Sequence, residues 1–406
     1  MRRPRLTQKR FALACAALIF LLTAAFSRAD RDADGAASAE PIYATVGAVG
    51  DIIVMDGQSA GAYDDATGTY DFARSFAGMA DCLSGVDLMC GNLEVPLAGE
   101  KFGYAQRRRN PGEYQVFNAP DALADALAGA GFDVLTTANN HCLDCGAEGL
   151  YRTIRVLDEK GIRHTGTALG AAERRKPLVV DINGIRVGIV AATEYTNDNL
   201  GSLSKPEQSY AVTTLYKHRD LLLADIAACR ESGAEFVIVF PHWGQEKSAE
   251  PKPLSRRCAA ELIAAGADAV LGAHSHCVQE AEYITVQRGG KPYTGLVVYS
   301  MGNFISNMLD EPYKYGLFVR LTLKKDAGVV TLERADCLPT LTFSRRNENK
   351  RSAYEVVPAL SDPENIESYS PLSETELRFI EKARAYVGKA VHADVLPLME
   401  DLCWKN

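Results

Sequence analysis

Apolar and polar positions along this chain form blocks that predict strands and helices in turn. Short apolar runs bounded by Gly, Asn or Asp have the length of buried strands. They predict strands at 42–49, 86–90, 133–137, 178–182, 185–191, 235–240, 269–271, 295–300, 315–323 and 329–334. Longer stretches with apolar residues three and four positions apart predict helices at 72–83, 121–130, 147–160, 215–232 and 254–265. This alternation indicates an α/β protein.

The strongest hairpin signal is Asn183-Gly184, which joins the strands predicted at 178–182 and 185–191. Asn-Gly supplies the two positive φ angles that a type I′ turn needs. A second hairpin is predicted around 324–328. A hairpin inside an α/β pattern implies a second sheet, so we expect two packed mixed sheets with helices on their outer faces.

Residues 1–29 have the pattern of an export signal. A basic segment precedes the apolar run from Phe11 to Phe26, which is shorter than the roughly 18–20 residues of a comfortable membrane span. Ser27 and Ala29 are small residues at the −3 and −1 positions of a cleavage site. We therefore expect export with cleavage after Ala29 into a secreted protein; the alternative is an uncleaved anchor in the cell membrane.

The rest of the chain divides by composition. Residues 30–40 are small and polar and predict a linker, residues 41–346 predict the folded domain, and residues 347–406 predict a polar extension with one helix at 373–387. The formal net charge is −8, and the segment removed with the signal contains basic residues and no acid. This charge argues against a general binder of nucleic acid or of anionic membranes, and a polyanionic partner would need a local basic patch.

Polar groups follow directly where predicted strands end, and at an open α/β sheet that is where ligands bind. Four of the seven histidines lie in these segments. Carboxylate, amide and imidazole groups that converge from separate strands are typical of metal-dependent hydrolysis. The segments are Gly50-Asp51, Gly91-Asn92-Leu93-Glu94, Asn139-Asn140-His141, Pro241-His242-Trp243-Gly244 and Gly272-Ala273-His274-Ser275-His276.

These segments, in this order and followed by Gly302-Asn303, resemble the CapA family of poly-γ-glutamate capsule synthesis proteins. The resemblance implies a four-layer α/β/β/α fold similar to calcineurin-like metallophosphoesterases, with a dinuclear centre of divalent metal ions such as Mn, Zn, Fe or Mg. It implies the metal ligands Asp51, Glu94, Asn140, His242, His274 and His276, with Glu94 as the bridging residue. It also implies that His141, steered by Asp144, is an outer-sphere acid or cation.

Two departures from the phosphoesterase pattern bear on the centre. The usual Asp-x-His pair is Asp51-Ile52-Ile53 here, so one imidazole ligand is missing, and the bridging Asp is replaced by Glu94. The metal ion beside Asp51 is therefore expected to have fewer protein ligands here than in the phosphoesterase pattern.

Substrate contacts are predicted at two kinds of residue. Asn92, Asn139 and Asn303 are expected to position substrate or to support ligands. Arg107, Arg108 and Arg109, flanked by Tyr104 and Tyr114, either clamp carboxylates or phosphates or form a solvated loop.

Nine of the ten cysteines follow the signal. Cys90, Cys142 and Cys277 adjoin the predicted centre, and Cys142-Leu143-Asp144-Cys145 is a C-x-x-C sequence. A structural disulfide or buried thiols are expected there rather than a redox dithiol.

The resemblance implies a protein that acts in synthesis, release or attachment of poly-γ-glutamate, with this anionic polymer and membrane capsule-synthesis proteins as partners. Two other functions fit the same residues. One is a non-catalytic scaffold that binds polyanions, and the other is an extracytoplasmic phosphatase or phosphodiesterase.

Overall fold

The computed structural model describes residues 40–104, 107–108, 114–205, 208–361 and 372–400. Within the described residues, Ile42–Lys325 and the chain from Val329 onward form one compact unit. The predicted export signal and nearly all of the predicted linker lie outside the described residues and stay predictions. No helix within the described ranges is long and apolar enough to span a membrane.

The larger sheet has eight strands in the order β18-β17-β16-β1-β4-β7-β8, with β15 paired to β1. Strands β1, β4, β7 and β8 run parallel, and β16 is antiparallel to β1. The strands are β1 (Ile42–Ile52), β4 (Leu88–Leu93), β7 (Val134–Thr136), β8 (Arg163–Thr165), β15 (Asn303–Ile305), β16 (Tyr315–Asp326), β17 (Val329–Arg346) and β18 (Ser352–Pro358). The parallel strands therefore direct their carboxyl ends to one edge of this sheet.

The smaller sheet has six strands in the order β13-β14-β12-β11-β10-β9. They are β9 (Leu178–Ile182), β10 (Ile185–Thr193), β11 (Phe236–His242), β12 (Ala269–Leu271), β13 (Ala281–Arg288) and β14 (Lys291–Val298). The β9–β10 hairpin is confirmed, with φ of 54° at Asn183 and 81° at Gly184. Strands β10, β11, β12 and β14 run parallel.

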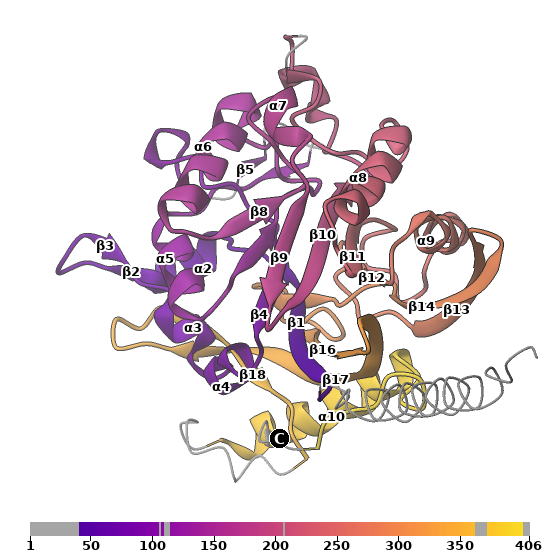
Figure 1. The fold of residues 1–406 in the computed structure, drawn as a ribbon. Coiled ribbons are helices and arrows are strands. Elements are labelled where there is room, and N and C mark those ends of the chain that lie inside the picture. The colour runs from indigo at the N-terminus through magenta and orange to yellow at the C-terminus, as the bar shows by residue number, and fades with distance from the viewer. Residues whose placement is uncertain (1–39, 105–106, 109–113, 206–207, 362–371, 401–406) are drawn as a thin grey trace, which may run out of the picture. The chain divides into compact units, whose positions relative to one another are not determined.

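Helices cover the outer face of each sheet (Figure 1). Those on the larger sheet are α3 (Ala73–Ala77), α4 (Ala80–Ser84), α5 (Ala122–Gly129) and α6 (Gly146–Glu159), and those on the smaller sheet are α8 (Arg219–Glu231) and α9 (Pro253–Ala265). Smaller elements are α2 (Asp56–Ala62), β2 (Tyr63–Asp64), β3 (Thr69–Tyr70), a 3-10 turn at Glu100–Phe102, β5 (Arg107–Arg108), β6 (Gln115–Val116), α7 (Ala171–Arg174) and a second 3-10 turn at Asn199–Ser202. The helix predicted at 72–83 is two short helices, because the chain leaves helical geometry between Gly78 and Met79.

Successive side chains of a strand point to opposite faces of its sheet, so the buried apolar residues form three separate layers. Val187 and Ile189 of β10 pack with Val46 of β1 in the core between the sheets, whereas Val190 packs outward against α8 and α9. Phe76 and Leu127 pack against the outer face of the larger sheet. The predicted four-layer α/β/β/α sandwich of two mixed sheets is confirmed.

Residues after Asn347, predicted as an extension, contribute to this sandwich. Strand β18 pairs with β17 in the larger sheet. Helix α10 (Glu374–Ala390), the helix predicted at 373–387, begins at a Ser373–Glu376 capping box and buries Ile380, Ala383 and Val387 in the core between the sheets. The apolar residues of α10 recur with the helical period, so the sequence alone predicted the helix. The period does not say what the helix packs against, so its place in the core was not predicted.

Candidate metal centre

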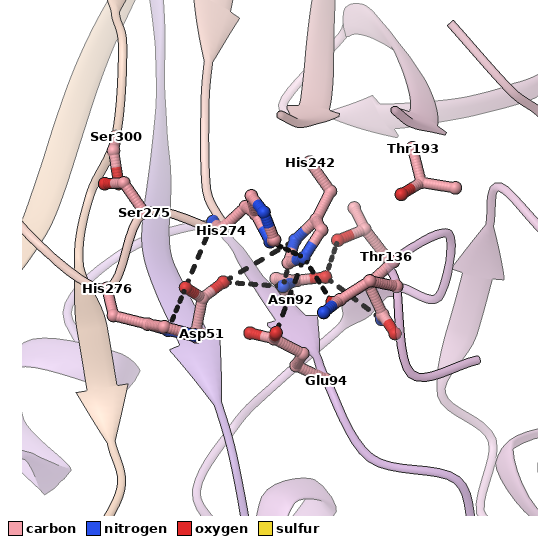
Figure 2. A network of polar contacts seen from close by, with 12 residues as sticks. Asp51, Asn92, Glu94, Thr136, Thr193, His242, His274, Ser275, His276 and Ser300 are labelled. Carbon is pink, nitrogen blue, oxygen red and sulfur yellow. Dashed lines mark hydrogen bonds and ion pairs between the residues drawn. The ribbon is translucent and has the colours of Figure 1, made fainter. Parts of the chain in front are cut away.

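The strand ends that the sequence singled out converge on one buried point. The register of β1 and β4 places Asp51 opposite Asn92, and Glu94 follows β4 directly. Strand β11 ends at His242, and the loop after β12 provides His274 and His276. Each of the predicted ligands has 3% or less of its surface exposed. Figure 2 shows Asp51, Glu94, His242 and His274 directed toward one another.

Within the described residues, Glu94, His242 and His274 form a group with ligand atoms within 4.8 Å of one another. His242 Nε2 lies 3.4 Å from Glu94 Oε1 and 3.0 Å from His274 Nδ1. It also lies 2.9 Å from the side-chain oxygen of Asn140. Four side chains from four segments thus direct lone-pair atoms at one place.

Asp51, Glu94 and His276 form a second such group. His276 Nδ1 lies 3.3 Å from Asp51 Oδ2. Glu94 belongs to both groups, which is the shared position that the family resemblance implied for it. The structure therefore brings all six predicted ligands together and leaves their role as ligands a prediction.

The chemistry of these side chains fits a divalent cation. Both carboxylate oxygens of Glu94 are buried without a hydrogen-bond partner in the described structure. Burial, followed by the charge of Asp51, raises the pKa of Glu94 well above its usual value. A buried charge needs a partner, and a cation between the two groups would supply one. Atoms bound to one ion at about 2.1 Å lie about 3.0–3.4 Å apart, close to the separations around His242 Nε2.

The imidazoles of the first group are in the form that binds metals. Burial lowers the pKa of His242 to about 3 and that of His274 well below its usual value, so both rings are neutral at physiological pH. His276 differs. Burial alone would lower its pKa, but its hydrogen bond to Asp51 and the charge of that carboxylate raise it. Burial alone would raise the pKa of Asp51, but the hydrogen bond to His276 and the nearby imidazoles lower it.

Three asparagines predicted to position substrate or support ligands are in contact with the ligand segments. Asn92 Nδ2 donates to Asp51 Oδ1 at 2.7 Å and lies 3.2 Å from His242 Nδ1. Asn303 Oδ1 lies 2.9 Å from His276 Nδ1. Asn139 Nδ2 donates to the Leu93 carbonyl at 2.7 Å. All three are 3% exposed or less, a position that favours support of the ligands over contact with substrate.

His141 and Asp144 form the predicted pair. His141 Nδ1 lies 2.7 Å from Asp144 Oδ2, which also accepts from the backbone N–H of Phe117 at 2.7 Å. The Phe117 ring packs 4.2 Å from the imidazole, centroid to centroid. A carboxylate on Nδ1 fixes the ring and leaves Nε2 for other chemistry. The contribution of this pair to catalysis remains a prediction.

The predicted arginine clamp is described only in part. Arg107 and Arg108 form β5, which pairs with β6. Their side chains and all of Arg109 lie outside the described residues, so this prediction stays open.

The cysteines beside the centre are thiols. Cys90, Cys142 and Cys277 are free and buried. Burial raises the pKa of the Cys142 thiol to about 12, and Cys145 Sγ donates to the Phe117 carbonyl at 3.6 Å. Of the two expectations, buried thiols agree with the structure.

Ile53 stands where the resemblance to the phosphoesterase pattern led us to expect an imidazole. It is 1% exposed and belongs to the apolar cluster on the outer face of the larger sheet. The second group therefore contains one imidazole where the first contains two. The departure seen in the sequence is thus a difference in the number of imidazoles, since each group contains three His, Asp or Glu residues.

Sequence reasoning missed residues at the end of β10. The Tyr195 ring lies 5.2 Å from that of His274, and its hydroxyl accepts from Lys252 Nζ at 2.8 Å and donates to the Gly244 carbonyl. Asn197 contacts Asn140. The apolar run of β10 gives way to Thr193-Glu194-Tyr195-Thr196-Asn197, the same signal that identified the other segments.

Comparisons with known proteins agree with this reading of the sequence. A capsule biosynthesis protein CapA of Bacillus anthracis is 29% identical over 234 residues, 57% of this chain and 53% of that protein. A PGA biosynthesis protein CapA of Bacillus subtilis strain 168 is 24% identical over 242 residues, 59% of this chain and 58% of that protein. The match thus spans little more than half the length of these relatives.

Among solved structures, a calcineurin-like phosphoesterase of Bacillus subtilis aligns with 87% of this chain and 99% of its own, at a TM-score of 0.40 and 14% identity. Residues 45–308 match the family described as bacterial capsule synthesis protein PGA_cap. That stretch is well over half of the 406 residues and contains every predicted metal ligand. The chain therefore belongs to the PGA_cap family of bacterial capsule synthesis proteins.

Proposed function

We propose that this protein acts in the synthesis, release or attachment of poly-γ-glutamate through a hydrolase-type centre that holds two divalent metal ions. The observation that carries the proposal is Glu94, a fully buried carboxylate shared by both ligand groups and without a hydrogen-bond partner in the described structure. Family membership and the name of the Bacillus subtilis relative support the choice of polymer.

In this proposal Asp51, Glu94 and His276 hold one ion, and Glu94, Asn140, His242 and His274 hold the other. Divalent cations bound there would supply Lewis acidity and lower the pKa of water. Imidazole nitrogen ligands suit Zn or Fe, whereas carboxylate and amide oxygen ligands suit Mn or Mg.

The chain's own residues supply orientation and a proton. Asn92 and Asn303 hold Asp51 and His276 by hydrogen bonds. His141, fixed through Nδ1 by Asp144, donates a hydrogen bond or proton from Nε2 as charge develops on a leaving group. Each residue acts from a buried position, so the geometry is held before substrate binds.

The anionic polymer is proposed as the substrate class, with membrane capsule-synthesis proteins as partners. The chain carries net negative charge, so a polyanion would approach through a local group of cations. Lys252, hydrogen-bonded to Tyr195 beside His274, provides one such cation, although Glu194 also lies 3.5 Å from its Nζ.

The test combines elemental analysis of the purified protein with two hydrolysis assays, one on poly-γ-glutamate and one on a chromogenic phosphate ester. We expect bound divalent metal and cleavage or transfer of the polymer. Metal with rapid ester turnover and no action on the polymer would instead favour the phosphatase function. Absence of metal, with retained polymer binding, would favour the scaffold.

Export is the second part of the proposal, with the protein either secreted or held at the outer side of the cell membrane. Small residues Ser27 and Ala29 support cleavage, and we expect the mature protein to begin near Asp30. Mass spectrometry of the cell-derived protein measures its N-terminus. Recovery of an intact chain containing Phe11–Phe26 in the membrane fraction would replace cleavage with anchoring.

A further inference from the structure

The segment after β10 lies against the candidate metal centre, although none of its residues belongs to the predicted ligand set. The register of β10 and β11 pairs Thr193 with His242, and the Glu194 N–H donates to the His242 carbonyl at 2.8 Å. Asn197, three residues further on, is 9% exposed. Sheet pairing therefore fixes the start of this segment at the centre, and the contact with Asn140 places Asn197 there.

Asn197 contacts the amide of Asn140. The side-chain oxygen of Asn140 lies 2.9 Å from His242 Nε2, and its Nδ2 donates to Asn197 Oδ1 at 3.3 Å. An amide has an oxygen and a nitrogen of nearly equal size, so a half-turn of Asn140 would exchange its ligand atom for an NH₂ group. A fixed acceptor for Nδ2 prevents that exchange.

We propose that Asn197 is a positioning residue. It orients the Asn140 amide toward the ion that His242 and His274 would hold, and it packs against His141 beside that amide. This inference rests on the proposed function, because it assigns a role to Asn197 through that centre. Outer partners of this kind affect metal binding because they fix the ligand atom before the ion arrives.

The second contact of Asn197 is with the predicted acid. Asn197 Nδ2 lies 3.5 Å from His141 Nδ1, whereas Asp144 Oδ2 lies 2.7 Å from the same nitrogen. Because the contact with Asp144 is the shorter one, we assign the Nδ1 hydrogen of His141 to a hydrogen bond with Asp144. Asn197 therefore acts on His141 by packing against it. One side chain thereby contacts both the predicted ligand and the predicted acid.

The backbone allows a clean test. Asn197 and its neighbour Asp198 both have left-handed φ angles, 47° and 59°, which Asn, Asp and Gly tolerate best. Asn197→Gly therefore removes the amide without straining the backbone. Asn197→Asp keeps an acceptor for Asn140 Nδ2. Asp198→Gly makes the same backbone change at an exposed neighbour and serves as the control.

The experiment measures Mn²⁺ binding to the full chain by calorimetry, together with the visible spectrum of Co²⁺-loaded protein. We expect Asn197→Gly to weaken Mn²⁺ binding about 10- to 100-fold and to alter the Co²⁺ spectrum, because loss of an outer partner typically has that effect. We expect Asn197→Asp to recover most of the affinity and Asp198→Gly to match the wild type.

Three outcomes would overturn the proposal, and they differ in what else they leave standing. Wild-type affinity and spectrum in Asn197→Gly would overturn the role of Asn197 and leave the metal centre standing. Absence of Mn²⁺ and Co²⁺ binding by the wild type would overturn the proposed centre and the role with it. Equal weakening in Asp198→Gly would assign the effect to the loop backbone and also overturn the proposal.

Discussion

Replacing Glu94 with Gln is expected to remove bound metal from both ligand groups, a larger loss than any single histidine substitution would cause. Glu94 is the residue that the two groups share. Its amide replacement keeps the size of the side chain and removes the negative charge. Elemental analysis of purified Glu94→Gln measures the loss, and metal content equal to that of the wild type would contradict the shared role.

The same substitution is expected not to weaken the metal-free protein. Because burial and Asp51 raise the pKa of Glu94 in the folded state, this group opposes folding once the pH rises above its unfolded pKa. Gln removes that opposition at neutral pH. Urea unfolding in the presence of a chelator measures it, and we expect a midpoint no lower than that of the metal-free wild type.

Asp336→Asn is the matched control for Glu94→Gln. Asp336 is also fully buried, but Arg320 and Arg334 pair with it at 2.8 and 2.6 Å. Loss of the charge that pairs with the mostly buried Arg320 is expected to destabilise folding, whereas the pair with Arg334, whose side chain is 62% exposed, contributes little. We expect Asp336→Asn to lower stability and keep metal, the reverse of Glu94→Gln. Matching behaviour of the two variants would show that Glu94 has only a structural role.

His141→Ala is expected to keep metal content near that of the wild type and to lower activity by about 10²- to 10⁴-fold, the usual contribution of general acid catalysis. His141 is fixed by Asp144 and Phe117 and belongs to neither ligand group. The measurements are elemental analysis and the polymer assay, or the capsule of cells that carry the variant.

His274→Ala is the comparison for His141→Ala, because it removes a predicted ligand and should lower bound metal several-fold. Loss of metal from His141→Ala as severe as that from His274→Ala would make His141 a ligand. Retention of both metal and activity by His141→Ala would argue for the scaffold function instead.

The sequence revealed most elements of the fold because their signals are local. The β9–β10 hairpin was predicted from Asn183-Gly184, since that pair favours one turn type. Strand β13 was missed, although its alternating burial and its Tyr, Ile, Thr and Val residues are typical of a half-buried edge strand. Strand β18 was missed because it lies in the segment that was interpreted as a polar extension, although the structure buries Val356 and Val357 within it.

The sequence by itself determined which residues have the chemistry of the centre. Polar groups placed directly after apolar strands must gather at the carboxyl edge of parallel sheets, and the histidines are concentrated there. It also determined that one imidazole is missing, because Ile53 stands at that position.

Only the tertiary structure decided how these residues meet. It placed Glu94 in both ligand groups, assigned Asn92 and Asn303 contacts with Asp51 and His276, and brought Asn197 against Asn140. Such contacts join segments far apart in the chain, and their geometry depends on the register of paired strands and on the packing of two sheets. A linear pattern carries neither quantity, because it records which side chains follow a strand and not which of them face each other across the space between strands.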